Sequence, residues 1–253
     1  MAHYRVPVSF IAEFVSAVVT GRSLDFSREA RFLATGISPA IEILGRDHIP
    51  ETGPCVITPN HFARPGFRAW WIAIGISANV PVNVHWFMTS NWTSHHFWQK
   101  GWYEQVTCWL FERIARVFSF GQLSSIDSDE IGGNRLPQVR ALMSSAVENV
   151  HSQNSRDAVL GLAPEGGDMP GGALGWPPKG SGKLFQFFSN LGYGINPVGV
   201  YESNNRFVIN FGEQYRLSTN REFSAVTRDI QIRRIVMSHI AMCLPDHLKG
   251  EFR

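Results

Sequence analysis

Cysteine is scarce in this chain, and no two cysteines stand close together. The three cysteines of the 253 residues are Cys55, Cys108 and Cys243. A disulfide framework or a cysteine-ligated zinc site needs paired or closely spaced cysteines, so this spacing argues against both and suits a reducing compartment. The histidines give no metal signal either, because His85, His95 and His96 lack His-Glu-x-x-His spacing. No metal is therefore expected.

Strong net charge and long apolar runs are also missing. A formal net charge of +2 gives no reason to expect a nucleic-acid partner. No apolar run reaches the ~20 residues that a membrane-spanning helix needs. The first six residues do not resemble a signal peptide, and no Gly-x-Ser-x-Gly elbow indicates a serine hydrolase. Together with 44% hydrophobic residues, these absences predict a globular protein in the cytoplasm.

Segments typical of strands and of helices alternate along the chain. Short apolar runs bounded by Gly and Pro predict strands at 41–45, 55–58, 82–88, 117–120, 159–162, 195–201 and 206–211. Longer runs predict helices at 6–20, 27–33, 67–78, 97–115, 137–150, 183–191 and 221–244. This alternation predicts the α/β class: a single domain with a mostly parallel mixed sheet flanked by helices, preceded by an N-terminal helical hairpin.

Residues 1–36 are expected to form that hairpin, and residues 37–253 the α/β domain. The first helix carries one charge, Glu13, and Ser27 is a candidate N-cap for the second. Basic residues lie beside these helices: Arg5, Arg22, Arg28 and Arg31. The residues leave two alternatives open, a helix pair packed on the core or an anchor in a membrane interface.

The turn that follows the apolar segment 55–58 carries the clearest chemical signal. It places Asn60 and His61 between a buried-type strand and the start of a helix, where open α/β sheets usually carry their chemistry. The strand at 159–162 ends in a second such turn, Ala163-Pro164-Glu165-Gly166-Gly167. We expect His61 and Glu165 to lie on adjacent strand-end loops and to form one site.

Four blocks stand in the same order and rough spacing as in a known family. They are Asn60-His61, Ala163-Pro164-Glu165-Gly166-Gly167, Pro178-Lys179-Gly180 and Ile195-Asn196-Pro197-Val198-Gly199-Val200. Over residues 41–250 the chain thus resembles the lysophospholipid/glycerolipid acyltransferases of the acylglycerol-phosphate acyltransferase type. The resemblance implies transfer of a fatty acyl group to a lipid-like acceptor of the lysophospholipid or glycerol-phosphate type. The acyl donor would be acyl-CoA or acyl carrier protein, used as a co-substrate, with no cofactor.

The resemblance also implies roles for single residues and a location. His61 would be the general base, and the expected substrate-binding residues are Asn60, Arg64, Glu165, Gly166, Gly167 and Lys179. Among these, Arg64 is not part of a family block and is included because it is a cation close to His61 in the sequence. The protein would work at a membrane surface, peripheral to the inner face of the membrane.

The chain departs from the family pattern at its charged positions. In the family, an Asp follows the first block after four residues, and here that position is Gly66. The carboxylates available in its place are Glu165, Asp168, Asp127 and Asp129. In the third block, Asp168 stands at the position where the family has an Arg. Residues 117–122 correspond to the second block and lack the Arg that the family has there. These departures keep an alternative open: a catalytically impaired or inactive lipid- or acyl-binding member of the same fold. The oligomeric state is left open.

Overall fold

The structure is a computed structural model that describes residues 2–89, 102–123, 143–144, 158–167, 172–218 and 223–253. Its helices are α1 (Val8–Thr20), α2 (Phe26–Ala34), α3 (Trp70–Asn79), α4 (Trp102–Phe118), α6 (Ser181–Asn190) and α7 (Ala225–Met242), with 3-10 turns at Arg46–His48 and Asp246–Leu248. Its strands are β1 (His3–Tyr4), β2 (Ile37–Ser38), β3 (Glu42–Leu44), β4 (Cys55–Pro59), β5 (Val84–Thr89), β6 (Gly121–Leu123), β7 (Val159–Gly161), β8 (Gly194–Ser203) and β9 (Arg206–Phe211).

Seven strands of the described residues form one sheet in the order β3-β9-β8-β4-β7-β5-β6. The five strands from β8 to β6 run parallel to one another. β9 runs antiparallel to β8, and β3 pairs parallel to β9. The sheet is therefore mixed and mostly parallel, and the predicted α/β fold class is confirmed.

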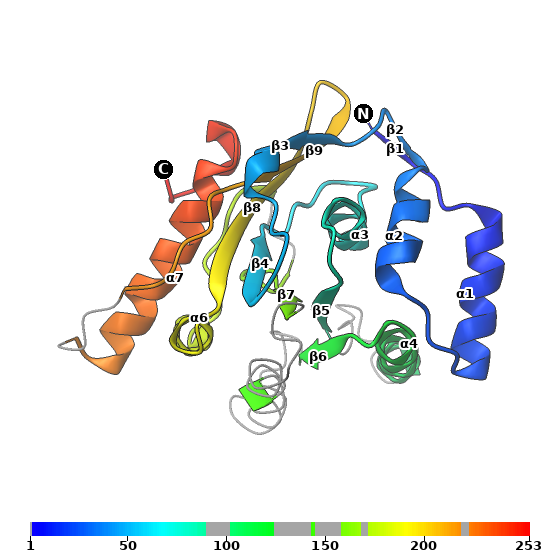
Figure 1. Ribbon diagram of the computed structural model, residues 1–253, viewed down its shortest axis with the longest axis horizontal. Helices are drawn as coiled ribbons and strands as arrows, with labels where there is room; N and C mark the ends of the chain where they lie inside the picture. Colours follow the sequence, from blue (N-terminus) through cyan, green and yellow to red (C-terminus); the bar gives the residue numbers. More distant parts are fainter. Residues whose placement is uncertain (1, 90–101, 124–142, 145–157, 168–171, 219–222) are drawn as a thin grey trace.

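Helices cover both faces of this sheet (Figure 1). α3 lies on one side, and α6 and α7 pack against β8 on the other. On the α3 side, Trp86 Nε1 of β5 donates a hydrogen bond to Ser77 Oγ of α3 at 2.8 Å. All five residues of β4 are buried. A strand covered on both faces is expected to be continuously apolar rather than alternating, which explains the run Cys-Val-Ile-Thr-Pro.

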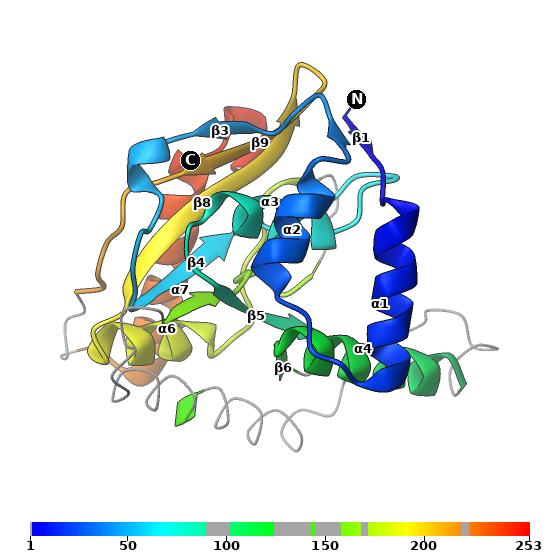
Figure 2. The same cartoon turned by 45° about the vertical axis from the view of Figure 1, so that its right-hand side comes forward.

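The N-terminal helices extend the α3 layer outward (Figures 1 and 2). α2 packs along α3, and α1 contacts α4. The N-cap of α2 is Asp25 and not the predicted Ser27: the Asp25 carboxylate accepts from Arg28 N at 3.2 Å, whereas Ser27 is buried inside the first turn. Both residues can cap a helix, so local chemistry alone does not choose between them. The division into residues 1–36 and 37–253 stays a prediction.

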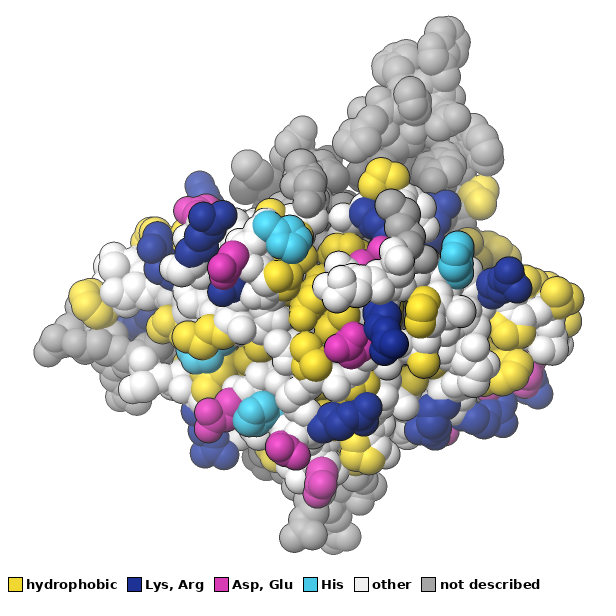
Figure 3. Space-filling model, turned by 90° about the horizontal axis from the view of Figure 1, so that it is seen from above, with side chains coloured by type: hydrophobic (Ala, Val, Ile, Leu, Met, Phe, Trp, Pro, Cys, Tyr) yellow, Lys and Arg dark blue, Asp and Glu magenta, His cyan; other side chains and the backbone are white. Residues whose placement is uncertain are grey.

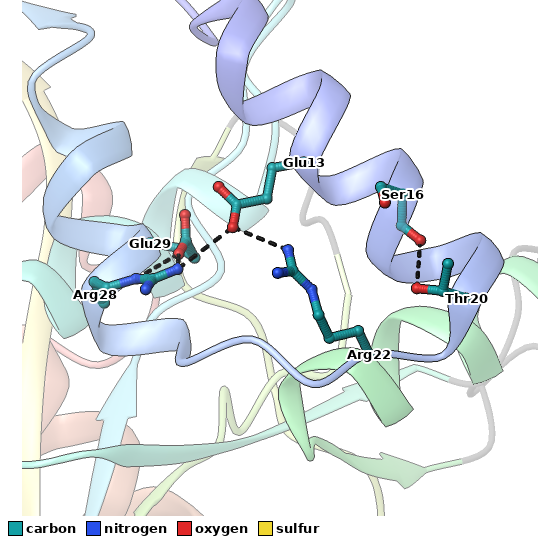
Figure 4. A network of polar contacts seen from close by, with 6 residues as sticks. All are labelled: Glu13, Ser16, Thr20, Arg22, Arg28 and Glu29. Carbon is teal, nitrogen blue, oxygen red and sulfur yellow. Dashed lines mark hydrogen bonds and ion pairs between the residues drawn. The ribbon is translucent and has the colours of Figure 1, made fainter.

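A polar network joins α1 to α2 (Figure 4). The Glu13 carboxylate of α1 pairs with Arg22 at 3.0 Å and with Arg28 at 3.5 Å. Arg28 also donates to Glu29, the next residue along α2, from Nε and one terminal nitrogen at 2.8 and 2.6 Å. Within the described part of the chain, no helix has both the length and the apolar character needed to cross a membrane.

One sequence expectation about elements is wrong, and others cannot be compared. α4 continues through Phe118, so the strand expected at 117–120 is absent and β6 begins at Gly121 instead. Ser119, with a φ of 55°, ends the helix, and Phe120 N–H bonds Ala115 O at 2.8 Å in the manner of a Schellman cap. His95, His96 and, apart from 143–144, the helix expected at 137–150 lie outside the described residues.

Candidate functional site

His61 follows the central strand β4, at the edge where parallel strands end. β4 pairs with β8 on one side and with β7 on the other. The carboxyl ends of parallel neighbours meet at one edge of a sheet, and ligands of open α/β sheets bind outside that edge. His61 and the turn that begins after β7 therefore start from adjacent positions. His61 itself is half-buried.

Asn60 ties the end of β4 to β8. Its Nδ2 donates to Val200 O at 2.9 Å, and its Oδ1 accepts from Val200 N at 2.6 Å. The side chain is 1% exposed and imitates one more pair of backbone hydrogen bonds between the two strands. The residue expected to bind substrate is thus engaged with the backbone of a neighbouring strand. We call this arrangement the Asn60 bridge.

Glu165 ties His61 to the segment that follows β7. Its Oε2 accepts from the backbone N–H of His61 at 2.6 Å, and its Oε1 accepts from the N–H of Gly175 at 2.8 Å. The side chain is 2% exposed. The two expected turns therefore do meet, through a carboxylate that contacts backbone. We call this arrangement the Glu165 bridge.

The electrostatics of Glu165 follow from that burial. Loss of water around the carboxylate raises its pKa above the ordinary value. The two backbone donors and the charge of a protonated His61 act in the opposite direction and lower the pKa. Desolvation is the largest of these effects. Such a shift at the carboxyl edge of a sheet is typical of functional sites and also of structural carboxylates, so geometry has to decide between the two roles.

Arg64 is engaged by a second carboxylate. Its Nε donates to Glu202 Oε2 at 2.7 Å and a terminal nitrogen donates to Glu202 Oε1 at 2.6 Å, a two-point ion pair between the His61 loop and β8. The Tyr4 hydroxyl of β1 donates to the same carboxylate at 2.5 Å. Burial and the Glu202 hydrogen bond raise the pKa of Tyr4. The cation expected near the substrate is therefore already matched by an anion.

Glycines shape the loops around His61. Gly66 has a φ of 81°, a left-handed conformation that side chains adopt at a cost, and a Cβ built there would meet only Arg64 Nη1, at 3.5 Å. Gly172, with a φ of 70°, packs so closely that a Cβ would lie 2.7 Å from Ala63 O. Gly166 also has a positive φ, and Gly167 has open space where a side chain would be.

Lys179 lies apart from these contacts. It is exposed and immediately precedes Gly180, the N-cap of α6. The Gly180 N–H donates to Asp229 Oδ2 of α7 at 3.0 Å, so a carboxylate already occupies the N-terminus of α6. Among the described residues, Lys179 takes no part in the hydrogen bonds that link His61, Glu165 and Gly175.

Residues that sequence reasoning did not name complete the site. Glu202, Tyr4 and Gly175 reach it from β8, from the N-terminal strand and from the segment after Glu165. The contacts of Glu202 with Arg64 and Tyr4 span 138 and 198 residues of sequence, and no local pattern marks them. Asp127, Asp129 and Asp168 lie outside the described residues.

No group of three or more His, Cys, Asp or Glu side chains in the described part of the chain is arranged to hold a metal ion. His85, in β5, is half-buried and its ring packs edge-on against Phe87 at 5.1 Å. Burial lowers the pKa of His85, which suits a neutral packed ring.

Comparison with known proteins gives a likeness in structure and none in sequence. No protein-family model matches the sequence, and no curated protein matches it. Among solved structures, the chain is similar to the crystal structure of the 1-acyl-sn-glycerophosphate (LPA) acyltransferase, PlsC, from Thermotoga maritima. The two share 13% sequence identity with a TM-score of 0.48, over 83% of this chain and 75% of that chain.

Proposed function

We propose that this protein is an acyltransferase that moves a fatty acyl group from acyl-CoA or acyl carrier protein to a lipid-like acceptor. The acceptor is of the lysophospholipid or glycerol-phosphate type, and the reaction takes place at the inner face of a membrane. The observation that carries the proposal is the 2.6 Å contact between Glu165 and the His61 amide, 104 residues apart in sequence. It joins two of the four blocks that resemble the glycerolipid acyltransferases.

In the proposed reaction, His61 is the general base. Its imidazole takes the proton of the acceptor hydroxyl, whose oxygen attacks the carbonyl carbon of the acyl thioester. The tetrahedral intermediate collapses, the carbon–sulfur bond breaks, and the leaving thiolate takes the proton back from His61. The exposed Gly166 and the neighbouring half-buried Gly167, which has open space where a side chain would be, leave room for the acceptor beside this histidine. Lys179 would attract a negatively charged donor or acceptor.

Thiol release tests this function. Purified protein is mixed with acyl-CoAs of several chain lengths, or with acyl carrier protein loaded with a fatty acyl group, and with a mixture of lysolipid acceptors. We expect thiol release that needs an acceptor and falls about 10²–10⁴-fold in His61→Ala. His48→Ala, a histidine exposed on the 3-10 turn Arg46–His48, is the matched control and should keep full activity. Release that survives in His61→Ala would refute His61 as the base.

A second candidate function is binding without turnover. The observation that favours it is Gly66, which offers no carboxylate at the family position. A catalytically inactive relative would bind acyl donor or lysolipid, measurable by calorimetry, and would release no thiol with any acceptor. Its binding would also be insensitive to His61→Ala. Calorimetry and thiol release, both measured on the wild type and on His61→Ala, therefore separate the two functions.

The membrane part of the proposal rests on the outer surface of α1. One side of this helix packs on α4 through Phe14, which stacks on Phe118 at 5.9 Å. Another side of the helix exposes apolar side chains at helical spacing: Val8, Ile11, Val15 and Val19. α4 exposes Val106, Trp109 and Leu110. Figure 3 shows hydrophobic side chains with Lys and Arg beside them at the α1 end of the molecule. Such a surface suits an interface rich in anionic lipid.

Vesicle flotation tests this surface. Val15 and Val19 are 52% and 70% exposed, and on α7 Val226 is 71% exposed, which makes it a matched control. We expect Val15→Glu/Val19→Glu to reduce binding to anionic vesicles at least about tenfold. Two valines that no longer enter the membrane and two added negative charges together weaken binding by more than about 1.4 kcal/mol. Val226→Glu should bind as the wild type does, and added salt should weaken binding. If Val15→Glu/Val19→Glu and Val226→Glu bind vesicles equally well, the exposed side of α1 does not bind the membrane and α1 only packs against the rest of the protein.

A further inference from the structure

We propose that Glu165 is a positioning residue, which fixes the backbone of His61 and does not contact the substrate. This inference rests on the proposed function, in which His61 is the base. It departs from the role expected from sequence, where Glu165 binds the substrate. The residue acts on the reaction through His61.

The first observation is where the carboxylate oxygens go. One oxygen accepts the His61 amide at 2.6 Å and the other accepts the Gly175 amide at 2.8 Å. Glu165 is 2% exposed, so the molecule that accepts the acyl group has almost no surface of Glu165 to bind. A buried carboxylate is stable only when donors replace the lost water, and these two amides are such donors.

The second observation is what the bridge holds together. Gly175 belongs to the segment 172–176, which is also attached elsewhere: Leu174 N donates to Leu248 O at 2.9 Å. Gly172 of the same segment touches Ala63 O of the His61 loop closely enough to exclude a side chain. The segment is thus fixed to the C-terminal 3-10 turn, and Glu165 transmits that fixed position to His61.

The third observation is that His61 is held from both sides of its strand. The Asn60 bridge ties the preceding residue to β8, and the Glu165 bridge ties His61 itself to the segment after β7. A base must lie within hydrogen-bond reach of the proton that it takes, and a displacement of about 1 Å costs about 10²-fold in rate. The bridge has a further consequence. The His61 and Gly175 amides donate to Glu165, so they do not stabilise the negatively charged oxygen of the tetrahedral intermediate.

The test compares two buried carboxylates that each hold a loop amide. Glu165→Gln keeps the shape but offers one oxygen to two amides. Asp229→Asn is the control, because Asp229 is 6% exposed and accepts the Gly180 amide at 3.0 Å at the start of α6. In Glu165→Gln we expect kcat to fall about 10–100-fold while the KM for the acceptor stays within about twofold. In Asp229→Asn we expect kcat within about twofold of the wild type.

A second measurement does not need turnover. Hydrogen exchange of the His61 amide should be at least about tenfold faster in Glu165→Gln than in the wild type and unchanged in Asp229→Asn. If the wild type releases no thiol, the proposed function fails, whereas the exchange comparison still tests the positioning role. If Glu165→Gln does not fold, Glu165→Asp takes its place, since its shorter side chain reaches only one of the two amides and should also speed exchange.

Several results would overturn the proposal. A higher KM with unchanged kcat in Glu165→Gln would make Glu165 a substrate contact. An equal loss of kcat in Asp229→Asn would make the effect a general loss of stability. Unchanged exchange at His61, in the Gln or the Asp variant, would mean that the carboxylate does not hold this amide.

Discussion

Replacing Asn60 by alanine should destabilise the fold by more than any exposed substitution. Asn60 is 1% exposed, and its amide group makes two hydrogen bonds to Val200, at 2.9 Å to the carbonyl and at 2.6 Å from the N–H. Alanine removes the donor and the acceptor together. The carbonyl and the N–H of Val200 then stay buried without those partners.

The size of the effect follows from these two groups. A buried polar group that loses its partner costs about 1–3 kcal/mol, so Asn60→Ala should cost about 2–6 kcal/mol. For a chain of this length, 1 kcal/mol corresponds to roughly 2–4 °C in Tm. A loss near the middle of that range, about 4 kcal/mol, lowers Tm by roughly 8–16 °C.

Thermal and urea unfolding measure this loss, with Thr58→Val as the control. Thr58 is also buried in β4 and makes one hydrogen bond, from Oγ1 to Asn196 O at 3.2 Å. Its isosteric replacement should cost about 1 kcal/mol. The reasoning fails if Asn60→Ala lies within about 0.5 kcal/mol of the wild type, or if it costs no more than Thr58→Val.

Three further changes have expected outcomes. Arg64→Ala removes a two-point, largely buried ion pair with Glu202 and should cost about 1–3 kcal/mol in urea unfolding; a variant as stable as the wild type would contradict the pair. Gly66→Asp should lose about 1–2 kcal/mol because of its φ of 81°, and should raise thiol release by at most about 10²–10⁴-fold; a folded variant without gain over an active wild type would mean that another group already orients His61. Burial raises the pKa of Glu165 above the ordinary carboxyl value of 4.5, so the wild type should be most stable relative to Glu165→Gln below pH 4.5 and should lose that advantage as pH rises through the raised pKa. Thermal melts of both proteins between about pH 4 and pH 8 measure the difference. A difference in stability that does not depend on pH would contradict the raised pKa.

Strand positions and the meeting of two turns were within reach of the sequence. β4 and β7 are short apolar runs that end in turns, and a parallel sheet brings such ends to one edge. The contact between His61 and Glu165 confirms that the two turns are adjacent. Which atoms make the contact was not predictable, because a carboxylate can bind a side chain, a substrate or a backbone amide from the same position.

Long-range ion pairs were out of reach. In the sequence Arg64 is a cation close to His61, whereas its partner Glu202 lies near the end of β8 and Tyr4 lies in the first strand. Their meeting depends on β8 lying beside β4 and on β1 reaching the same edge, which is tertiary information. The capping of α2 by Asp25 in place of Ser27 is a local choice between two capping residues, and the helix then buries Ser27.

The position of His61 after β4 explains why it can be held so firmly. β4 has a parallel neighbour on each side, β8 and β7, so both sides of the strand end offer a partner for a bridge. The Asn60 bridge uses one side and the Glu165 bridge uses the other. Among the described strands β6 lies at one edge of the sheet, so a histidine after it would have a strand neighbour on one side alone. In the function proposed above, His61 is a general base, and a general base gains rate from a fixed position. The centre of the sheet would then suit it better than an edge, and the carboxylate and amide beside it would serve its geometry while the acceptor is left to the loops outside.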